Sequence, residues 1–209
     1  MPSSILIQFA HPVFRKSRIN RSLLDAVRDL DHVTINDLYE EYPDFDIDVR
    51  REQKLLLEHD VIVFQHPLFW YSTPAILKQW EDLVLEYGFA YGNGGTQLVG
   101  KSLLTATTAG GPETAYNREG YNYFRIRELL TPIEQTARLC GMIYLPPFVV
   151  FGTLEISTKQ AAQEHAQRYR QLIIALRDGH FDPRTLESVT YLNELDPVLP
   201  TTGLPLNRS

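Results

Sequence analysis

Short apolar runs alternate with helical patterns along most of this chain. The apolar runs have the length of β-strands and lie at residues 5–9, 32–38, 61–65, 101–107 and 142–151, the last of which is interrupted by Pro146-Pro147. Helical patterns lie at residues 17 to about 30, 49–59, 75–80, 127–140 and 158–177. Strands that alternate with helices predict one parallel sheet with both of its faces covered.

The connections between these elements restrict the topology. Right-handed crossovers leave few arrangements, and we expect a three-layer α/β sandwich whose five-stranded parallel sheet has the flavodoxin-like order 2-1-3-4-5. Ser17 and Thr73 are expected to cap helices, with Pro74 in the first helical turn and Gly141 at a helix C-terminus. The polar and aromatic segment 39–48 is expected to form a loop.

Composition excludes several classes of protein. The 209 residues suit one domain, with 44% apolar and 22% charged residues. The net charge of −6 argues against nucleic acid as a partner. Cys140 is the only cysteine, so no disulfide forms within the chain, and no apolar stretch approaches the roughly 18 residues of a membrane span. Cysteine and histidine show no metal-binding spacing. We therefore expect a cytoplasmic protein.

The last 29 residues fall outside the alternating pattern. They begin at Phe181 and contain four prolines. We expect one domain over residues 1–180 and an extended C-terminal arm over residues 181–209.

Three segments that follow predicted strands suit a ligand, because open α/β sheets bind ligands at the carboxyl ends of their strands. The first, residues 11–20, leads into a helix whose N-terminal N–H groups favour phosphate. His11, Ser17 and Asn20 can add side-chain hydrogen bonds. Three basic residues raise the local potential: Arg15, Lys16 and Arg18. A plain helix cap and a solvated basic loop would leave the same pattern.

The second segment, residues 65–74, carries Phe69, Trp70 and Tyr71 where a polar turn would be usual. Large aromatic side chains at a strand end suit a flat, apolar ligand that can stack. Packing of the next helix onto the sheet is the alternative reason for their presence.

The third segment contains the pair Gly110-Gly111 directly after a predicted strand. Paired glycines let backbone N–H groups approach a ligand closely, although a flexible turn would use them too. In the expected topology the first, third and fourth strands end around one crevice. A phosphate loop, an aromatic wall and a glycine wall at that crevice describe a site for flavin mononucleotide (FMN).

Several motifs in combination carry a family resemblance over about residues 4 to 180. They are His11-Pro12 with Ser17 and Asn20, Tyr42–Phe45, Gln65–Leu68, Trp70–Ser72, Pro74–Trp80, Gly88–Gly92 and Leu145–Phe148. With these motifs the chain resembles the NAD(P)H:quinone oxidoreductase family of flavodoxin-like proteins. Within that family it is most similar to ancillary proteins of bacterial glutathione-gated (Kef-type) potassium efflux systems.

The resemblance implies a set of cofactor-binding residues for FMN, with FAD left open as an alternative. They are His11, Ser17, Arg18, Ile19, Asn20, Leu68, Phe69, Trp70, Tyr71, Thr108, Ala109, Gly110, Gly111 and Tyr116. Ala109 departs from the family pattern, which commonly has threonine there. Because that loop acts largely through backbone N–H groups, we expect flavin binding to survive this difference.

Two catalytic positions are implied as well, Tyr116 and Asn122. Tyr116 matches a tyrosine that contacts the flavin in animal quinone reductases, and Asn122 stands where those enzymes have a histidine. Asparagine can form hydrogen bonds but cannot take a proton, so a histidine proton relay is not expected.

The resemblance implies hydride transfer from NAD(P)H, as co-substrate, to a quinone by a ping-pong mechanism with one shared site. It also implies a homodimer, with residues 116–124 and 39–45 as our candidates for the interface. The alternative function is a flavin-bearing regulatory subunit of a membrane potassium efflux transporter, peripheral at the inner face of the cell membrane.

Overall fold

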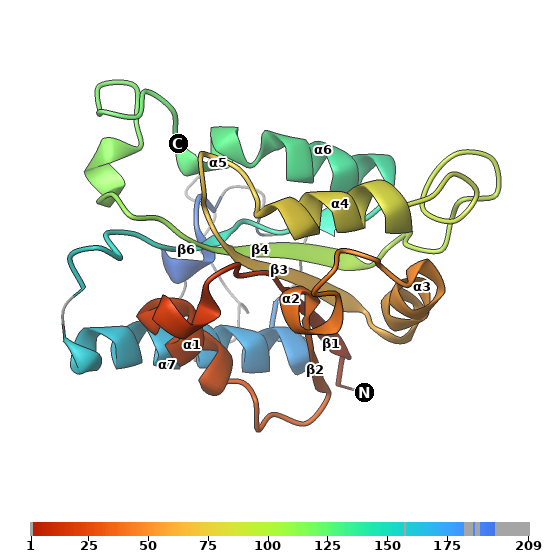
Figure 1. Ribbon diagram of the computed structural model, residues 1–209, viewed down its shortest axis with the longest axis horizontal. Coiled ribbons are helices and arrows are strands. Elements are labelled where there is room, and N and C mark those ends of the chain that lie inside the picture. The colour runs from red at the N-terminus through yellow and green to blue at the C-terminus, as the bar shows by residue number, and fades with distance from the viewer. Residues whose placement is uncertain (1, 157, 182–185, 187–188, 195–209) are drawn as a thin grey trace, which may run out of the picture.

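The computed structural model describes residues 2–156, 158–181, 186 and 189–194. Its centre is a parallel sheet of six strands, which crosses the middle of Figure 1. The strands are β1 (Ile5–Phe9), β2 (Val33–Asp37), β3 (Val61–Pro67), β4 (Ser102–Thr108), β5 (Ile143–Tyr144) and β6 (Phe148–Val150). Their order is β2-β1-β3-β4-β5, and β6 also pairs with β4, so the expected flavodoxin-like order is confirmed.

The predicted fifth strand is two strands in the structure. Pro146 and Pro147 separate β5 from β6, because proline has no N–H to donate to a ladder. Both halves lie beside β4, with Ser102 opposite Ile143 and Ala106 opposite Phe148. The described sheet therefore has six strands rather than the predicted five.

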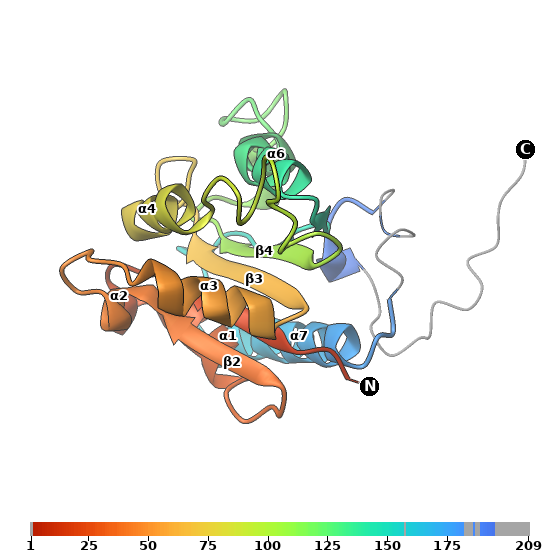
Figure 2. The same ribbon diagram turned by 90° about the vertical axis from the view of Figure 1, so that its right-hand side faces the viewer.

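Helices cover both faces of this sheet. They are η1 (Phe14–Lys16), α1 (Arg18–Asp25), α2 (Leu38–Glu41), α3 (Val49–Glu58), α4 (Ala75–Val84), η2 (Glu113–Ala115), α5 (Ile126–Leu129), α6 (Thr131–Leu139), α7 (Lys159–Arg177) and η4 (Leu192–Glu194), where η marks 3₁₀ helices. Helices α1 and α7 lie on one face and α3, α4 and α6 on the other, as Figures 1 and 2 show. This arrangement is the expected three-layer sandwich.

Three helix boundaries differ from the sequence-based expectation. Helix α1 ends at Asp25 rather than near residue 30, and the Arg170 guanidinium of α7 donates to the Ala26 carbonyl and to Asp29 at that end. The stretch predicted as one helix over 127–140 divides at Leu130 into α5 and α6, with Pro132 in the first turn of α6. The end of α1 depends on a contact with a distant helix, and the break at Leu130 depends on a proline. The hydrophobic periodicity of a helix predicts neither.

The third difference lies at the start of α4. Pro74 is the N-cap, with φ −58° and ψ 148°, and the helix begins at Ala75, so the prediction that Thr73 caps this helix was wrong. The Pro74 carbonyl accepts the N–H of Leu77, which is how the first turn closes. A short helix, α2, also stands inside the segment predicted as a loop, because the Asp37 carboxylate caps it.

The face of the sheet under α3 and α4 holds a buried carboxylate, Glu52. It accepts hydrogen bonds from Gln8 Nε2 (2.8 Å), the Tyr42 hydroxyl (2.6 Å) and Trp80 Nε1 (2.8 Å), among others. A buried charge is tolerated when several donors surround it. Glu52 thereby ties α3 to β1, to α4 and to the segment after α2.

The described residues after position 180 pack against the domain. Phe181, Leu186 and Leu192 are buried in the core formed by α1, α7 and the sheet. The Asn193 side chain exchanges hydrogen bonds with the backbone of Val149 in β6. The other residues of the predicted arm lie outside the described residues.

Two searches of the described residues add constraints. None of the described helices is both long enough and apolar enough to cross a membrane. Within the same residues, no group of three or more histidine, cysteine, aspartate or glutamate side chains could hold a metal ion.

Candidate functional site

The loops after β1, β3 and β4 leave the sheet at one edge, on the left of Figure 1. Two cavities open there. The helix-side cavity, about 540 Å³, is lined by His11, Val13, Lys16–Asn20, Pro67, Leu68, Phe69, Thr108, Gly110, Thr153 and Leu154. The aromatic cavity, about 390 Å³, is lined by Leu68, Trp70, Tyr71, Gly110–Pro112, Ala115, Tyr116, Tyr121 and Asn122. They meet at Leu68 and Gly110.

The first turn of α1 forms one wall of the helix-side cavity. The Ser17 hydroxyl caps the helix by accepting the Asn20 N–H at 3.3 Å. The first N–H groups of a helix have no acceptor within it, and the helix dipole places partial positive charge at this end. Lys16 and Arg18 add two cationic side chains, and no described residue that lines this cavity carries a carboxylate. The cavity therefore suits an anion.

Asn20 is buried and connects α1 to the end of β4. One end of its amide lies 2.9 Å from the Thr108 hydroxyl, and the other, assigned as Oδ1, is buried with no hydrogen-bond partner. The nitrogen and oxygen of such an amide can exchange places, because a threonine hydroxyl can donate or accept. In either orientation one polar atom of Asn20 remains for a ligand group.

His11 contributes a donor from the end of β1. Its Nδ1 accepts the Val13 N–H at 3.1 Å, and burial lowers the pKa of the imidazole. The neutral ring therefore carries its proton on Nε2. A phosphate beside that atom would accept a hydrogen bond from it.

The aromatic cavity is built from a strained turn. Phe69 and Ser72 exchange two backbone hydrogen bonds, at 3.1 and 3.0 Å, which leaves Trp70 and Tyr71 as the two residues of a tight turn. Both have positive φ, 49° and 64°, as in a type I′ turn. Each residue other than glycine in such a conformation costs about 1–3 kcal/mol of folding free energy, and such residues cluster at functional sites. The turn presents Trp70 with 93% of its surface exposed.

The two glycines after β4 have no conformational need to be glycine, because neither has a positive φ. A Cβ at Gly111 would lie 3.5 Å from Tyr116, an ordinary contact, and one at Gly110 would lie 3.3 Å from Leu154. The protein itself thus leaves room for a side chain at Gly111. Because glycine has no side chain, a ligand in the aromatic cavity can reach the backbone of Gly111.

Tyr116 and Asn122 both line the aromatic cavity. Burial raises the pKa of Tyr116, and its hydroxyl interacts with the backbone of Gly111. Asn122 Oδ1 accepts a hydrogen bond from the Tyr71 hydroxyl at 3.2 Å. The loops after β3 and β4 are therefore in contact.

The structure does not bring Ala109 to either cavity. Its side chain is fully buried, and its N–H donates to the Val150 carbonyl at 2.8 Å, which extends the β4–β6 ladder. The sequence reasoning also missed Thr153 and Leu154, which line the helix-side cavity. They follow β6, the second half of the strand predicted over 142–151, so the rule that ligands bind at carboxyl ends of strands could have found them.

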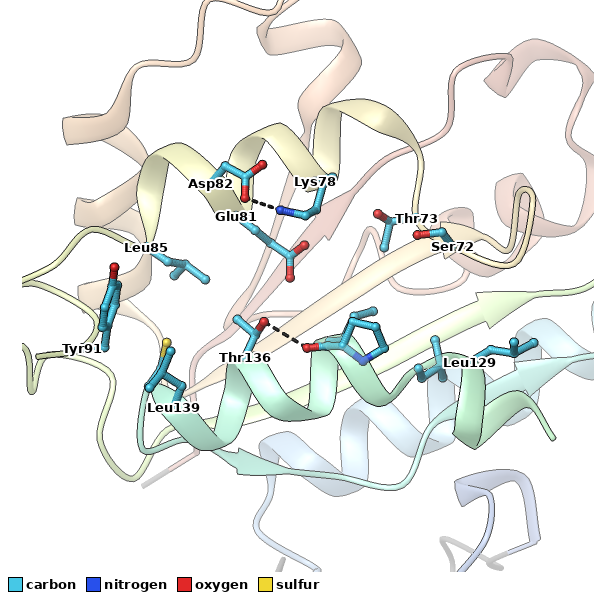
Figure 3. Close-up of a pocket in the computed structure, with 14 residues that line it drawn as sticks. Ser72, Thr73, Lys78, Glu81, Asp82, Leu85, Tyr91, Leu129, Thr136 and Leu139 are labelled. Atoms are coloured by element: carbon cyan, nitrogen blue, oxygen red, sulfur yellow. Dashed lines mark hydrogen bonds and ion pairs between the residues drawn. The ribbon is translucent and has the colours of Figure 1, made fainter. Parts of the chain in front are cut away.

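A third cavity, about 480 Å³, lies between α4 and α6. Figure 3 shows the Glu81 carboxylate pointing into it from α4, beside the ion pair of Lys78 and Asp82. Burial raises the pKa of Glu81 to about 7. This third cavity reaches the loop after β3 only at Ser72 and Thr73, and the carboxyl groups of Glu81 and Asp82 in its wall disfavour a phosphate. The two cavities at the strand ends are therefore the candidate site.

Comparison with known proteins identifies the family of this chain. Residues 3–173 match the protein family described as flavodoxin-like fold. The glutathione-regulated potassium-efflux system ancillary protein KefG of Yersinia enterocolitica is 46% identical over 170 residues, which are 81% of this chain and 92% of that protein.

Two solved structures are similar over nearly their whole length. General stress protein 14 from Treponema denticola, crystallised in complex with FMN, is 38% identical, with a TM-score of 0.79 and coverage of 83% of this chain and 99% of that one. An NADPH-quinone reductase from P. pentosaceus is 34% identical, with a TM-score of 0.74 and coverage of 81% and 97%.

Proposed function

This chain belongs to the protein family with the flavodoxin-like fold, and from that membership we propose that it is an FMN-dependent NAD(P)H:quinone oxidoreductase. The observation that carries the proposal is the junction of the two cavities at Leu68 and Gly110. One cavity offers donors and positive charge, and the other offers aromatic side chains and an open glycine backbone. FMN has a phosphate at one end and a flat ring at the other.

The residues at the helix-side cavity fit the phosphate end of FMN. His11 Nε2, the Ser17 hydroxyl and the first turn of α1 would hold the phosphate. The unpartnered polar atom of the Asn20 amide would meet the phosphate or a hydroxyl of the ribityl chain. A buried polar atom without a partner is costly, so a ligand that supplies one stabilises this end of the site.

The aromatic cavity fits the ring end. Bound FMN would supply the hydride-transfer chemistry. Backbone N–H groups of Gly110 and Gly111 would donate to the polar edge of the ring. Trp70 and Tyr71 would stand beside the exposed face of the ring, on which a nicotinamide and then a quinone would stack in turn. Because both reactants use this face, the proposed mechanism is ping-pong and needs no acid–base pair.

The test starts from the purified protein. After removal of any bound flavin, titration with FMN should quench flavin fluorescence with saturation in the micromolar range or below. NAD(P)H oxidation with a series of quinones should then give parallel double-reciprocal plots. Absence of saturable FMN binding contradicts the proposed cofactor, and intersecting plots contradict the shared site.

A second candidate function rests on a different observation, the 46% identity to KefG. In that case the chain is a flavin-bearing ancillary subunit that binds a membrane potassium efflux transporter. Tight FMN binding without NAD(P)H oxidation by any quinone would favour this function over the enzyme. The two functions can also coexist in one protein.

We also propose that the protein is a homodimer. Aromatic side chains are exposed around the aromatic cavity: Trp70 by 93%, Tyr121 by 81% and Tyr123 by 67%. A second subunit that covered them would bury this apolar surface and enclose the reacting groups. Sedimentation that shows only monomer at micromolar protein would contradict the homodimer.

A further inference from the structure

The two loops that form the aromatic cavity are joined by a side-chain hydrogen bond between residues 51 positions apart in the sequence. The Tyr71 hydroxyl donates to Asn122 Oδ1 at 3.2 Å. Tyr71 is half exposed, and both residues line the cavity. The bond therefore spans the cavity mouth, where a reactant would enter.

The turn that carries Tyr71 needs support from outside itself. Two successive residues other than glycine in the left-handed region persist only when the surrounding structure holds them there. The Phe69–Ser72 hydrogen bonds and the Leu68 N–H, which donates to the Thr108 carbonyl at 2.8 Å, fix the base of the turn. Among the described residues, the bond to Asn122 is the hydrogen bond that fixes its tip.

On the side of the aromatic cavity opposite the turn, two backbone hydrogen bonds hold Asn122 in place. Its N–H donates to the Ala115 carbonyl at 2.9 Å, and its own carbonyl accepts the Phe124 N–H at 2.8 Å. The backbone of Asn122 is thus tied to η2, directly after the Gly110-Gly111 pair. The amide oxygen therefore holds Tyr71 at a set distance from the glycine wall.

We propose that the Tyr71–Asn122 hydrogen bond fixes the width of the aromatic cavity and thereby disfavours broad, multi-ring quinones as electron acceptors. Tyr71 and Asn122 are positioning residues in this scheme. The inference rests on the proposed function. It gives Asn122 a role that requires only an acceptor atom, which suits an amide and does not require a group that can take a proton.

The first test measures the turn directly, without turnover. At protein concentrations low enough to keep the chain monomeric, Trp70 is almost fully exposed and Trp80 is 1% exposed, so iodide quenches the fluorescence of Trp70 selectively. The time-resolved anisotropy of the iodide-quenched fluorescence then reports the motion of Trp70. In Tyr71→Phe and in Asn122→Ala, the fast component of this anisotropy decay should be larger than in wild type, because the tip of the turn moves more freely. Tyr121→Phe is the matched control, since it removes a hydroxyl from the same cavity that forms no hydrogen bond to the turn among the described residues.

The second test measures acceptor choice. The ratio of kcat/KM for anthraquinone-2-sulfonate to that for 1,4-benzoquinone should rise about 2- to 10-fold in Tyr71→Phe and in Asn122→Ala, the range expected for loss of one neutral hydrogen bond. The double variant should match either single variant, because both remove one interaction. Asn122→Asp, which keeps an acceptor, should restore the wild-type ratio.

The outcomes separate this inference from the proposed function. Unchanged anisotropy, additive effects of the two substitutions, or an equal change in Tyr121→Phe would overturn the positioning role. A wild-type protein that reduces no quinone contradicts the proposed function and the acceptor limit together. The anisotropy experiment then still decides whether the hydrogen bond holds the turn.

Discussion

The helix-side cavity and the aromatic cavity share Leu68 and Gly110 but are built in opposite ways. The first lies at the start of a regular helix, with a buried amide, a capping hydroxyl and a neutral histidine, each held by a hydrogen bond. The second lies between two loops, with three left-handed aromatic residues: Trp70, Tyr71 and Tyr123. The helix-side cavity is therefore preorganised to hold a ligand, whereas the aromatic cavity stores strain and exposes aromatic surface. We expect the affinity for FMN to depend on the helix-side cavity, and the reaction rate and the choice of electron acceptor to depend on the aromatic cavity.

The largest effect should come from the helix-side cavity. Ser17→Ala combined with Asn20→Ala removes two hydrogen bonds to the phosphate region, each worth roughly 1.5–3 kcal/mol when one partner is charged. The Kd for FMN should therefore rise by about 10²- to 10⁴-fold, while kcat at saturating FMN stays near wild type. Fluorescence titration measures the first and steady-state kinetics the second.

Ser22→Ala is the matched control for that experiment. Ser22 lies on the same helix, but its hydroxyl donates to the Arg18 carbonyl and it does not line the helix-side cavity. Wild-type affinity in the double variant would mean that the phosphate is held elsewhere.

Acid should lower the free energy of unfolding through His66, which lies two residues before Leu68 of the aromatic cavity. His66 is fully buried with Nε2 unpartnered, and burial lowers its pKa to about 4. The unfolded chain takes up a proton below a pKa of about 6.5, whereas the folded protein does so only near 4, so the free energy of unfolding should fall by about 3 kcal/mol as the pH drops through this window. Urea unfolding at several pH values measures the slope.

His66→Gln should flatten that slope between about pH 6.5 and 4, even if the variant is less stable at neutral pH. The control is His32→Asn, at an exposed position whose φ of 64° asparagine tolerates. A slope that His66→Gln leaves unchanged would assign the acid sensitivity to other groups.

The next effect concerns Gly111, which lines the aromatic cavity only. Gly111→Val should lower kcat by about 10²-fold, because a side chain there displaces the ring from its position. In Gly111→Ala the fold should change little, since the added Cβ meets Tyr116 at an ordinary 3.5 Å. Thermal unfolding and kcat are the two measurements, and Gly111→Ala should give a smaller loss. A large drop in Tm with wild-type kcat would contradict this account.

The smallest effect is expected for Tyr116→Phe. The hydroxyl interacts with the Gly111 backbone and, in the proposed complex, would share the ring edge with backbone N–H groups, so its loss should lower kcat by only about 2- to 10-fold. Asn122→Ala should change kcat for a small quinone even less, because asparagine is no proton relay. A loss in Asn122→Ala that exceeds the loss in Tyr116→Phe would reverse the roles assigned to these two residues.

Much of the fold follows from local pattern. Alternation of strands and helices with right-handed crossovers is enough to predict the strand order, and Thr158 and Gly141 mark helix ends where the structure has them. The family resemblance stated from motifs is confirmed by the match to residues 3–173 and by the identity to KefG. Boundaries set by contacts between distant segments were missed, as where Arg170 meets the end of α1.

The candidate site divides in the same way. Residues that follow a strand directly, such as His11, Leu68 and Gly110, are brought together because parallel strands end at one edge. Ala109 is not, because its N–H donates to Val150 of β6, and the register of β6 beside β4 could not be predicted from the sequence. The bond between Tyr71 and Asn122 depends on two loop conformations, and no sequence spacing encodes it.

Cys140 has a consequence for the chemistry proposed here. It is the only thiol in the chain, it is 2% exposed, and burial raises its pKa to about 11. Thiolate is the form that attacks electrophiles, and at neutral pH such a cysteine is ionised in roughly one molecule in ten thousand. Quinones alkylate thiolates, so an enzyme that turns them over risks its own inactivation. The proposed enzyme would therefore turn over quinones without presenting them with a cysteine thiolate to alkylate.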